Sequence, residues 1–329
     1  MTSKLAIQAI PPPMITVDQL LPLLNVPVDF ASKDAELSIR GGNQLKPSEQ
    51  QRAEWLTTNG KFQSWFTSGR SDILVIDGMG DMTPISPMSY FCSLLSQQLS
   101  NIENAVPLTF FCGINRAGDE MGDATAMMRS LTSQLLINPH TYPKFDLRFM
   151  SFDAMMGVKD LRLDFLCELF RRLIGSLSPN TAIFILIDGM SWFENEPRRN
   201  NLWFVMQKLQ ELVFECNTVE ANGGCILKLL VTSPKMSMHV KHVFPREMHL
   251  VLPNEILGNG QSFNARQMAM QQQRLLGSAS SASSQGSGRL SWISSSNEGT
   301  PSRPGALVGQ NHDYFRRSSS SLNSPGWGT

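Results

Sequence analysis

The sequence lacks an excess of charge of either sign, and it lacks long hydrophobic runs. Lysine plus arginine and aspartate plus glutamate are equal at 28 each, which argues against a nucleic-acid partner bound through bulk charge. No apolar run approaches the roughly 20 residues that a membrane-spanning helix needs. Residues 1–13 lack the hydrophobic core of a secretory signal. We therefore expect a cytoplasmic or nuclear protein with neither a membrane nor a nucleic acid as its partner.

A cysteine framework is missing as well. The five cysteines are scattered, and no C-x-x-C pair is present. Zinc sites and disulfide scaffolds use paired cysteines at fixed spacings. We expect no metal site and five buried free thiols in a reducing compartment. The five cysteines are Cys92, Cys112, Cys167, Cys216 and Cys225.

Motifs for hydrolytic chemistry are also absent from the sequence. It contains no G-x-S-x-G nucleophile elbow and no H-E-x-x-H metal motif. His239 and His242 stand three residues apart, a spacing that can hold a metal on a helix, but no cysteine or acidic residue is placed beside them. A solvated surface is the favoured interpretation of this pair.

What the sequence does contain is an alternation of short apolar runs with amphipathic segments. The apolar runs span 73–78, 108–112, 183–188, 226–232 and 250–252, each typical of a strand covered on both faces. Apolar residues recur at helical spacing from about 86, over 124–136, over 158–177 and over about 200–215. We expect the helix at 158–177 to be the longest. The pattern predicts an α/β domain of three layers around a mostly parallel five-stranded sheet.

Segments of different composition flank this domain. Residues 1–45 predict a poorly ordered arm with at most a turn or two of helix, for which Thr16 is a candidate cap. The α/β domain follows over 46–255, beginning with an aromatic-rich helical lead-in for which Ser48 is a candidate cap. Residues 256–329 hold a helix remnant and then, from about 277, a Ser/Gly/Pro-rich tail that cannot bury a core and is predicted to be disordered.

Two patterns in this tail place serine after basic residues. Arg289 precedes Ser291, and Arg316 and Arg317 precede Ser319, as in substrates of basophilic kinases. Such short patterns are frequent by chance in Ser-rich sequence. On this basis Ser291 and Ser319 are the predicted phosphorylation sites, where phosphate would add negative charge.

The chain is organised around residues 73–86, which have the pattern of a buried strand, a glycine-bearing turn and the start of a helix. This is the layout of a P-loop, whose G-x-x-x-x-G-K-[ST] sequence holds phosphates through backbone N–H groups, a lysine and a hydroxyl. Starting that frame at Gly78 places Thr83 at the second glycine, Pro84 at the lysine and Ile85 at the hydroxyl. The strand-turn-helix layout is kept, but the phosphate ligands are lost, because proline offers neither a cation nor a backbone N–H.

Further polar positions are expected at the same edge of the sheet. Asp188 ends an apolar strand, as a Walker B carboxylate that holds Mg²⁺ does, although an Asp before Gly189 also simply turns a chain. Sites in parallel sheets lie beyond the carboxyl ends of the strands. The vestigial cofactor-binding loop is therefore predicted to comprise Gly78, Gly80, Thr83, Asp188, Thr232 and Ser233.

Several sequence blocks, in order, carry a resemblance to a known family. They are Trp55-Leu56 with Phe62 and Trp65, Phe110 to Gly113, Met128 to Leu131, Gln134 to Leu136, Ile185 to Gly189 and Leu229 to Ser233. Over roughly residues 50–253 the chain resembles the NACHT-type STAND P-loop ATPase domains that are common in fungal proteins. The resemblance implies the strand order 5-1-4-3-2, with the Thr232 strand between the P-loop and Walker B strands.

The sequence departs from what this resemblance implies for an ATPase. Active members carry an acidic pair just after the Walker B residue, where this chain has Met190, Ser191 and Trp192. Glu194 follows nearby, and Pro234 replaces the sensor arginine after Thr-Ser. The low-complexity sequence after the sheet does not match the winged-helix lid. We therefore expect no catalytic residue, no ATP or Mg²⁺ cofactor and no enzyme activity, as in a pseudo-NTPase.

Two functional hypotheses remain open. The first is a non-catalytic P-loop-like module for protein interaction or signalling, which binds an unidentified protein partner through its former nucleotide edge, its arm or its tail. The second is a nucleotide-binding STAND-type switch with weak ATP affinity and little or no hydrolysis. The first is favoured because the sequence lacks the lysine, the Mg²⁺ hydroxyl, the acidic pair, the sensor arginine and the lid together.

Overall fold

The computed structural model describes residues 15–78, 80, 83–115, 120–141, 145–220, 224–235, 237–256 and 262–282. These ranges hold the predicted α/β domain apart from short gaps in its loops. The part of the predicted disordered tail beyond residue 282, including Ser291 and Ser319, lies outside the described residues.

The described residues form five strands in one parallel sheet, with the order β2-β3-β4-β1-β5 that the resemblance implied. The strands are β1 (Asp72–Asp77), β2 (Ala105–Phe111), β3 (Ala182–Asp188), β4 (Ile226–Ser233) and β5 (His249–Val251). The register pairs Asp77 with Ser233 and Phe111 with Asp188. Because these residues end their strands, the carboxyl ends of β1 to β4 lie level at one edge of the sheet.

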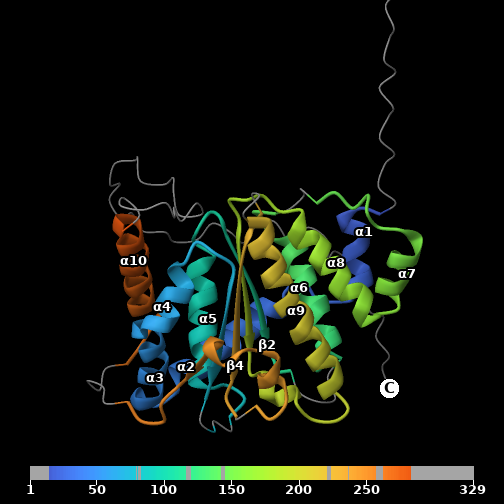
Figure 1. The fold of residues 1–329 in the computed structure, drawn as a ribbon. Helices are drawn as coiled ribbons and strands as arrows, with labels where there is room; N and C mark the ends of the chain where they lie inside the picture. Colours follow the sequence, from blue (N-terminus) through green and yellow to red (C-terminus); the bar gives the residue numbers. More distant parts are fainter. Residues whose placement is uncertain are drawn as a thin grey trace, which may run out of the picture. The chain divides into compact units, whose positions relative to one another are not determined.

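Helices cover both faces of the sheet, as Figure 1 shows with the sheet seen edge-on between them. The helices are α1 (Val17–Leu24), α2 (Phe30–Asn43), α3 (Pro47–Thr58), α4 (Gly60–Thr67), α5 (Pro87–Leu99), α6 (Ala124–Ile137), α7 (Phe152–Lys159), α8 (Leu163–Gly175), α9 (Arg199–Glu220) and α10 (Ala265–Ala282). Short 3-10 turns are η1 (Met190–Phe193), η2 (Val240–Val243) and η3 (Arg246–Met248). The prediction of a three-layer α/β domain is confirmed.

The core lies in two halves, one on each face of the sheet. In β1, Ile73 and Val75 pack with α1, α6, α8 and α9, whereas Leu74 and Ile76 pack with α3, α4, α5 and α10. Successive side chains of a strand point to opposite faces, and both faces here are apolar. This is why the strands are continuous hydrophobic runs, with every residue of β3 and β4 buried.

The expectation of a poorly ordered arm over residues 1–45 is wrong for its described part. Thr16 does cap α1, as predicted, through a capping box with Gln19. Beyond it, however, α2 extends over Phe30–Asn43, and its Gly42 lies so close to the Tyr90 ring that a Cβ would collide. The pattern was missed because α2 is polar on average and contacts the domain through small residues as well as apolar ones.

The prediction of one long helix over 158–177 is wrong, because this segment forms two helices, α7 and α8. Helix α9, with 22 residues, is longer than either. Leu161 has a left-handed φ of 54°, and the Arg162 N–H donates to the Gly157 carbonyl at 2.9 Å, which closes the end of α7. The apolar spacing continues across this break because both helices face the same half of the core.

Two helix limits also differ from prediction. The lead-in helix α3 begins at Pro47 with Lys46 as its N-cap, so Ser48 lies inside the first turn and is not the cap. The helix remnant near the end of the domain is α10, which continues through Ala282, past the expected start of the tail at about 277. Its Met268 is buried against the α3–α5 side of the domain.

Candidate functional site

The glycine-bearing turn after β1 is held against the end of β4 by its own backbone. The Gly78 N–H donates to the Ser233 carbonyl at 2.8 Å, and the Gly80 N–H donates to the Pro234 carbonyl at 3.0 Å. Gly80 has a backbone φ of +106°, which residues other than glycine rarely adopt. At Gly78, a Cβ would lie 2.6 Å from Met88 Cε. Gly78 is therefore favoured by the close approach of neighbouring protein, whereas Gly80, whose Cβ would meet no atom within 4 Å, is favoured by its backbone conformation.

Asp188 lies at the tip of β3, where it joins β4 to α5. It is only 1% exposed. Its Oδ1 accepts a 2.6 Å hydrogen bond from Thr232 Oγ1, and its Oδ2 accepts a 2.7 Å bond from Ser89 Oγ. Burial raises the pKa of the Asp188 carboxyl from 3.8 to about 6, and the hydrogen bonds from Thr232 and Ser89 work in the opposite direction.

Ser89 is the residue of this edge that the sequence interpretation missed. The frame begun at Gly78 placed the Mg²⁺ hydroxyl at Ile85, but α5 starts only at Pro87, with Ser86 as its N-cap. In a P-loop the hydroxyl residue directly follows the lysine in the sequence and joins the Walker B carboxylate. Ser89, and not Ile85, is therefore the hydroxyl residue that contacts Asp188, and Met88 precedes it in the sequence. The signal available in the sequence was the Ser-Pro pair at 86–87, which marks a helix start.

The N-terminus of α5 is capped by its own chain. Ser86 Oγ accepts hydrogen bonds from the N–H groups of Met88 at 3.1 Å and Ser89 at 3.2 Å. These are the amides that a phosphate occupies at a P-loop helix. Pro87 brings no N–H at all, and the fully buried Met88 brings no positive charge.

The loop before α5 lies across the end of β2. A Cβ at Gly113 would collide with the Pro84 carbonyl oxygen and would lie 3.1 Å from Trp192 Nε1. The predicted loop residue Thr83 is exposed, and its hydroxyl donates to the Ile85 carbonyl at 2.9 Å. The loop thus fills space at the edge with backbone, and Gly113 is needed for that close approach.

The segments after β3 and β4 cover the other side of this edge. Trp192 follows β3, and Lys235 Nζ lies 3.7 Å from the centroid of its ring, a cation–π contact. Ser233 Oγ donates to the Lys235 carbonyl at 2.6 Å, while the Lys235 N–H donates to Ser191 Oγ at 3.3 Å. Lys235, which follows Pro234 at the expected position of the sensor arginine, therefore packs on the Trp192 ring.

Glu194, the acidic residue nearest in sequence to Asp188, caps the 3-10 turn η2. One of its carboxylate oxygens accepts from Ser237 Oγ at 2.5 Å and from the Val240 N–H at 2.7 Å. The other accepts from the Met238 N–H at 2.9 Å. Both oxygens of Glu194 therefore have partners in the segment that leads into η2.

A second acidic contact at this edge was also missed from sequence. Asp77 ends β1, and its Oδ2 lies 2.6 Å from His249 Nδ1 at the start of β5. The Asp77 carbonyl also accepts from the Leu252 N–H at 2.8 Å. These contacts attach the short edge strand β5 to the turn that carries Gly78.

The structure brings the six predicted loop residues to one edge, but they do not form a metal centre. Within the described ranges, no group of three or more His, Cys, Asp or Glu side chains is arranged to hold a metal ion. His239, the N-cap of η2, and His242, within η2, are both exposed, and His239 Nε2 lies 3.4 Å from Arg199 Nη1. Of the helices whose residues are described, none has the length and apolarity needed to cross a membrane.

Comparison with known proteins places this edge inside a recognised family region. The family model described as nephrocystin 3, N-terminal, matches residues 51–233, which is more than half of the chain. A comparison with curated proteins gave no match. The matched region begins in α3 and ends with Ser233, so it contains β1 to β4 and the Ser89–Asp188 contact. The chain therefore belongs to the nephrocystin 3 N-terminal family.

Proposed function

We propose that this chain is a non-catalytic P-loop-like module that acts in protein interaction or signalling. The observation that carries this proposal is the internal use of the polar groups at the carboxyl edge. Asp188 is buried under Ser89 and Thr232. Ser86 caps α5, and Glu194 caps η2. Polar groups that are hydrogen-bonded within the fold must lose those bonds before they can bind a ligand, which costs free energy.

The chemistry of phosphoryl transfer supports the same conclusion. Catalysis in this class comes almost entirely from positioning and from charges that clamp the phosphates. The lysine position is taken by Met88, which is fully buried, and the sensor position by Pro234. Lys235, the next residue, rests on the Trp192 ring. The proposal is thus a pseudo-NTPase with no ATP or Mg²⁺ cofactor.

One observation favours the alternative, a nucleotide-binding switch with weak ATP affinity and little or no hydrolysis. A hydroxyl and a carboxylate meet at Ser89 and Asp188, and in P-loop proteins this pair holds Mg²⁺. With a pKa of about 6 the Asp188 carboxyl is mostly ionised at pH 7. Nucleotide entry would still require the Ser86 cap to open.

Thermal melting separates the two proposals. The full chain is melted with ATP or ADP, each with and without Mg²⁺, beside the Ser89→Ala variant. A ligand present at 100 times its Kd stabilises a protein by about 2.7 kcal/mol. We expect that nucleotide, with or without Mg²⁺, changes the Tm of neither protein. A saturable rise for the wild type that Ser89→Ala abolishes would establish the switch instead.

The interaction itself is tested by site-directed photo-crosslinking in cells. The photoreactive residue replaces Met238, which is 63% exposed beside the carboxyl edge, or Arg70, which is exposed just before β1 at the opposite end of the sheet. We expect a specific crosslinked protein from position 238 and none from position 70. Equal or absent crosslinking at both positions would contradict the use of this edge.

We place the chain with the degenerate NACHT-type STAND domains of fungal proteins, in the cytoplasm or nucleus. We also propose phosphorylation of Ser291 and Ser319, which follow basic residues and where phosphate can create or break a docking contact. Phosphopeptide mapping from cells that finds both serines unmodified would remove the basis for a regulated tail.

A further inference from the structure

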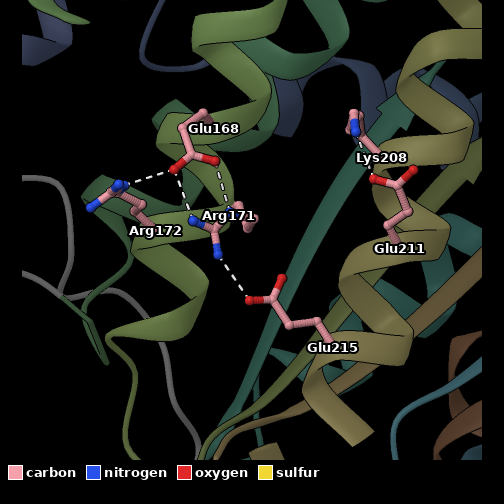
Figure 2. A network of polar contacts seen from close by, with 6 residues as sticks. All are labelled: Glu168, Arg171, Arg172, Lys208, Glu211 and Glu215. Atoms are coloured by element: carbon pink, nitrogen blue, oxygen red, sulfur yellow. Dashed lines mark hydrogen bonds and ion pairs between the residues drawn. The ribbon is translucent and has the colours of Figure 1, made fainter. Parts of the chain in front are cut away.

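Two pockets of the domain carry charged side chains, and they differ in how those charges are paired. The larger pocket, of about 410 Å³, is lined mainly by α8 and α9 and holds residues of both signs. Arg171 Nη1 on α8 pairs with Glu215 Oε1 on α9 at 2.8 Å, as Figure 2 shows. Lys208 Nζ pairs with Glu211 Oε2 at 2.6 Å in the same view. Each cation that lines this pocket thus has a carboxylate beside it, which disfavours an anionic ligand.

The second pocket, of about 330 Å³, lies at the start of α9 beside η2. Its described lining consists of a guanidinium, an amide, two imidazoles and an indole ring, without a carboxylate. These residues, all exposed or half-buried, are Arg199, Asn200, Trp203, His239 and His242. The guanidinium, the amide and the imidazoles can all donate N–H groups. The pocket therefore combines hydrogen-bond donors with an aromatic side chain.

Both walls of this pocket come from segments that leave the carboxyl edge of the sheet, where ligands of α/β folds bind. The α9 wall follows β3, and the η2 wall follows β4. Two contacts hold the walls together: Gln210 Nε2 on α9 donates to the Val243 carbonyl at 2.7 Å, and the Glu194 carboxylate accepts from the Val240 N–H at 2.7 Å. The pocket is thus held in shape by the fold itself, which lowers the cost of ordering it around a ligand.

Arg199 has two contacts of different character. Its Nη2 lies 2.5 Å from Oε1 of Glu196, whose side chain is 62% exposed. Exposed ion pairs of this kind contribute little to stability, so an anionic ligand can replace that carboxylate at small cost. Arg199 Nη1 lies 3.4 Å from His239 Nε2. Protonation of this imidazole places two positive charges side by side, and an anion bound to both side chains relieves the repulsion.

We propose that this pocket binds the phosphate group of a phosphorylated side chain on a partner protein, with phosphotyrosine preferred over phosphoserine. A phosphate brings a charge of about −1.5 to −2 and three acceptor oxygens, which match the N–H donors of the pocket. The ring of phosphotyrosine can also stack on Trp203, whereas a serine side chain cannot. Met238, 63% exposed and next to His239, offers an apolar contact to the rest of the peptide. The inference rests on the proposed function, because it names the chemistry of the partner that binds this edge.

Isothermal titration of the full chain at constant ionic strength tests the site with small probes. The probes are the N-acetyl amides of phosphotyrosine, phosphoserine, tyrosine and glutamate, together with AMP. We expect saturable binding of both phosphorylated amides, about three to ten times tighter for phosphotyrosine, and no binding of tyrosine or glutamate. Failure of both phosphorylated amides to bind would overturn the proposal. AMP that binds this pocket more tightly than phosphotyrosine does would assign it to a nucleotide instead.

Four variants locate the binding. His239→Gln and His242→Gln replace exposed imidazoles and should each weaken both phosphorylated amides by about two- to tenfold. Trp203→Leu should weaken phosphotyrosine and leave phosphoserine unchanged, because only the tyrosine ring contacts it. Lys208→Gln, the matched control, removes an exposed cation of α9 outside this pocket and should bind like the wild type. An equal loss of binding in Lys208→Gln would show diffuse attraction to surface charge and would overturn the site. The histidine variants decide the question even if Trp203→Leu fails to fold.

Photo-crosslinking from position 238 separates this inference from the proposed function. The double variant His239→Gln/His242→Gln should lose the crosslinked protein that the otherwise unchanged chain gives. Undiminished crosslinking by the double variant would leave the proposed interaction intact and overturn the phosphate site. Binding of phosphotyrosine by the purified chain, without a crosslinked protein in cells, would leave the site intact and count against the proposed function.

Discussion

Ser89 and Asp188, which are 99 residues apart in the sequence, share a 2.7 Å hydrogen bond from Ser89 Oγ to Asp188 Oδ2. The serine lies in the first turn of α5 and the aspartate at the tip of β3. The contact joins the start of the helix after β1 to the centre of the sheet. It occupies one oxygen of Asp188, and Thr232 Oγ1 occupies the other.

Removal of the Ser89 hydroxyl should destabilise the fold. Ser89→Ala leaves one oxygen of a buried carboxylate without its donor, and hydrogen bonds to charged groups contribute about 1.5–3 kcal/mol. Thr232→Val should have an effect of similar size, because Thr232 Oγ1 also accepts from the Gly189 N–H at 3.0 Å. Urea denaturation measures both. Since both hydroxyls act on Asp188, the double variant should differ from the sum of the single ones; additive effects would show that the bonds are independent.

The pH dependence of stability should carry a contribution from Asp188. The carboxyl titrates near 3.8 when the chain is unfolded and near 6 in the fold, so the folded state binds more protons between these values. Stability should therefore fall as pH rises from about 4 to about 6, by about 3 kcal/mol, and level off above.

The Asp188→Asn variant should lack this part of the profile. Urea denaturation at a series of pH values measures the difference between variant and wild type. The exposed Asp153→Asn is the control and should follow the wild type. A difference between Asp188→Asn and the wild type that does not change with pH would contradict a raised pKa.

The close approach of Pro84 to Gly113 predicts an asymmetry between two glycines. Gly113→Ala places a methyl group against the Pro84 carbonyl oxygen, and overpacking typically costs about 1–3 kcal/mol. Gly175→Ala at the end of α8 meets no atom within 4 Å, and it should be neutral or stabilise by up to about 1 kcal/mol. Thermal melting compares them. Equal effects would mean that the loop before α5 does not lie over β2.

ATP hydrolysis by the purified protein should not exceed background. No side chain at the first turn of α5 supplies the lysine, because Met88 stands there. Met88→Lys restores the cation beside Ser89 but not an acid that positions water, so it should not produce turnover either. Phosphate release measures both proteins. Turnover by the wild type that Asp188→Ala abolishes would make this protein a divergent ATPase.

Removal of the N-terminal 45 residues should lower Tm by many degrees. Leu20 and Leu24 of α1 are fully buried. Arg129 on α6 donates through Nε to the Leu24 carbonyl at 2.6 Å, and Asn115 Nδ2 donates to Asp34 Oδ2 on α2 at 2.6 Å. The truncation therefore exposes apolar surface and leaves buried polar groups without partners.

Removal of residues 283–329 serves as the comparison at the other end of the chain. That segment has no apolar periodicity to bury, so Tm should stay nearly unchanged. The same scan on both truncated proteins and the full chain provides the measurement. A large loss of Tm on removal of 283–329 would show that the tail packs on the domain.

The sequence by itself determined the sheet and most of its helices. Continuous apolar runs at the right lengths located all five strands. Both faces of β3 and β4 are buried, so these strands read as continuous apolar runs, whereas the short edge strand β5 is partly exposed. Even β4 was found, although Lys228 stands inside it. Only the tertiary structure shows how that lysine is tolerated: Nζ donates to the Trp65 carbonyl at 2.7 Å and to Ser68 Oγ at 2.6 Å.

What the tertiary structure decided is which polar groups meet. The sequence placed Asp188 and Thr232 at the carboxyl edge and a helix start at about residue 86, but it set the hydroxyl of the loop four residues early. The turn after Gly78 has no fixed length in sequence, and only the tertiary structure shows which hydroxyl meets Asp188. The helix α2 was missed for a related reason. Its Gly42 packs on the Tyr90 ring and its Asp34 accepts a hydrogen bond from Asn115, and neither contact is visible in the sequence of the helix itself. Periodicity encodes burial along one element, whereas a contact such as that of Ser89 with Asp188 depends on elements far apart in the chain.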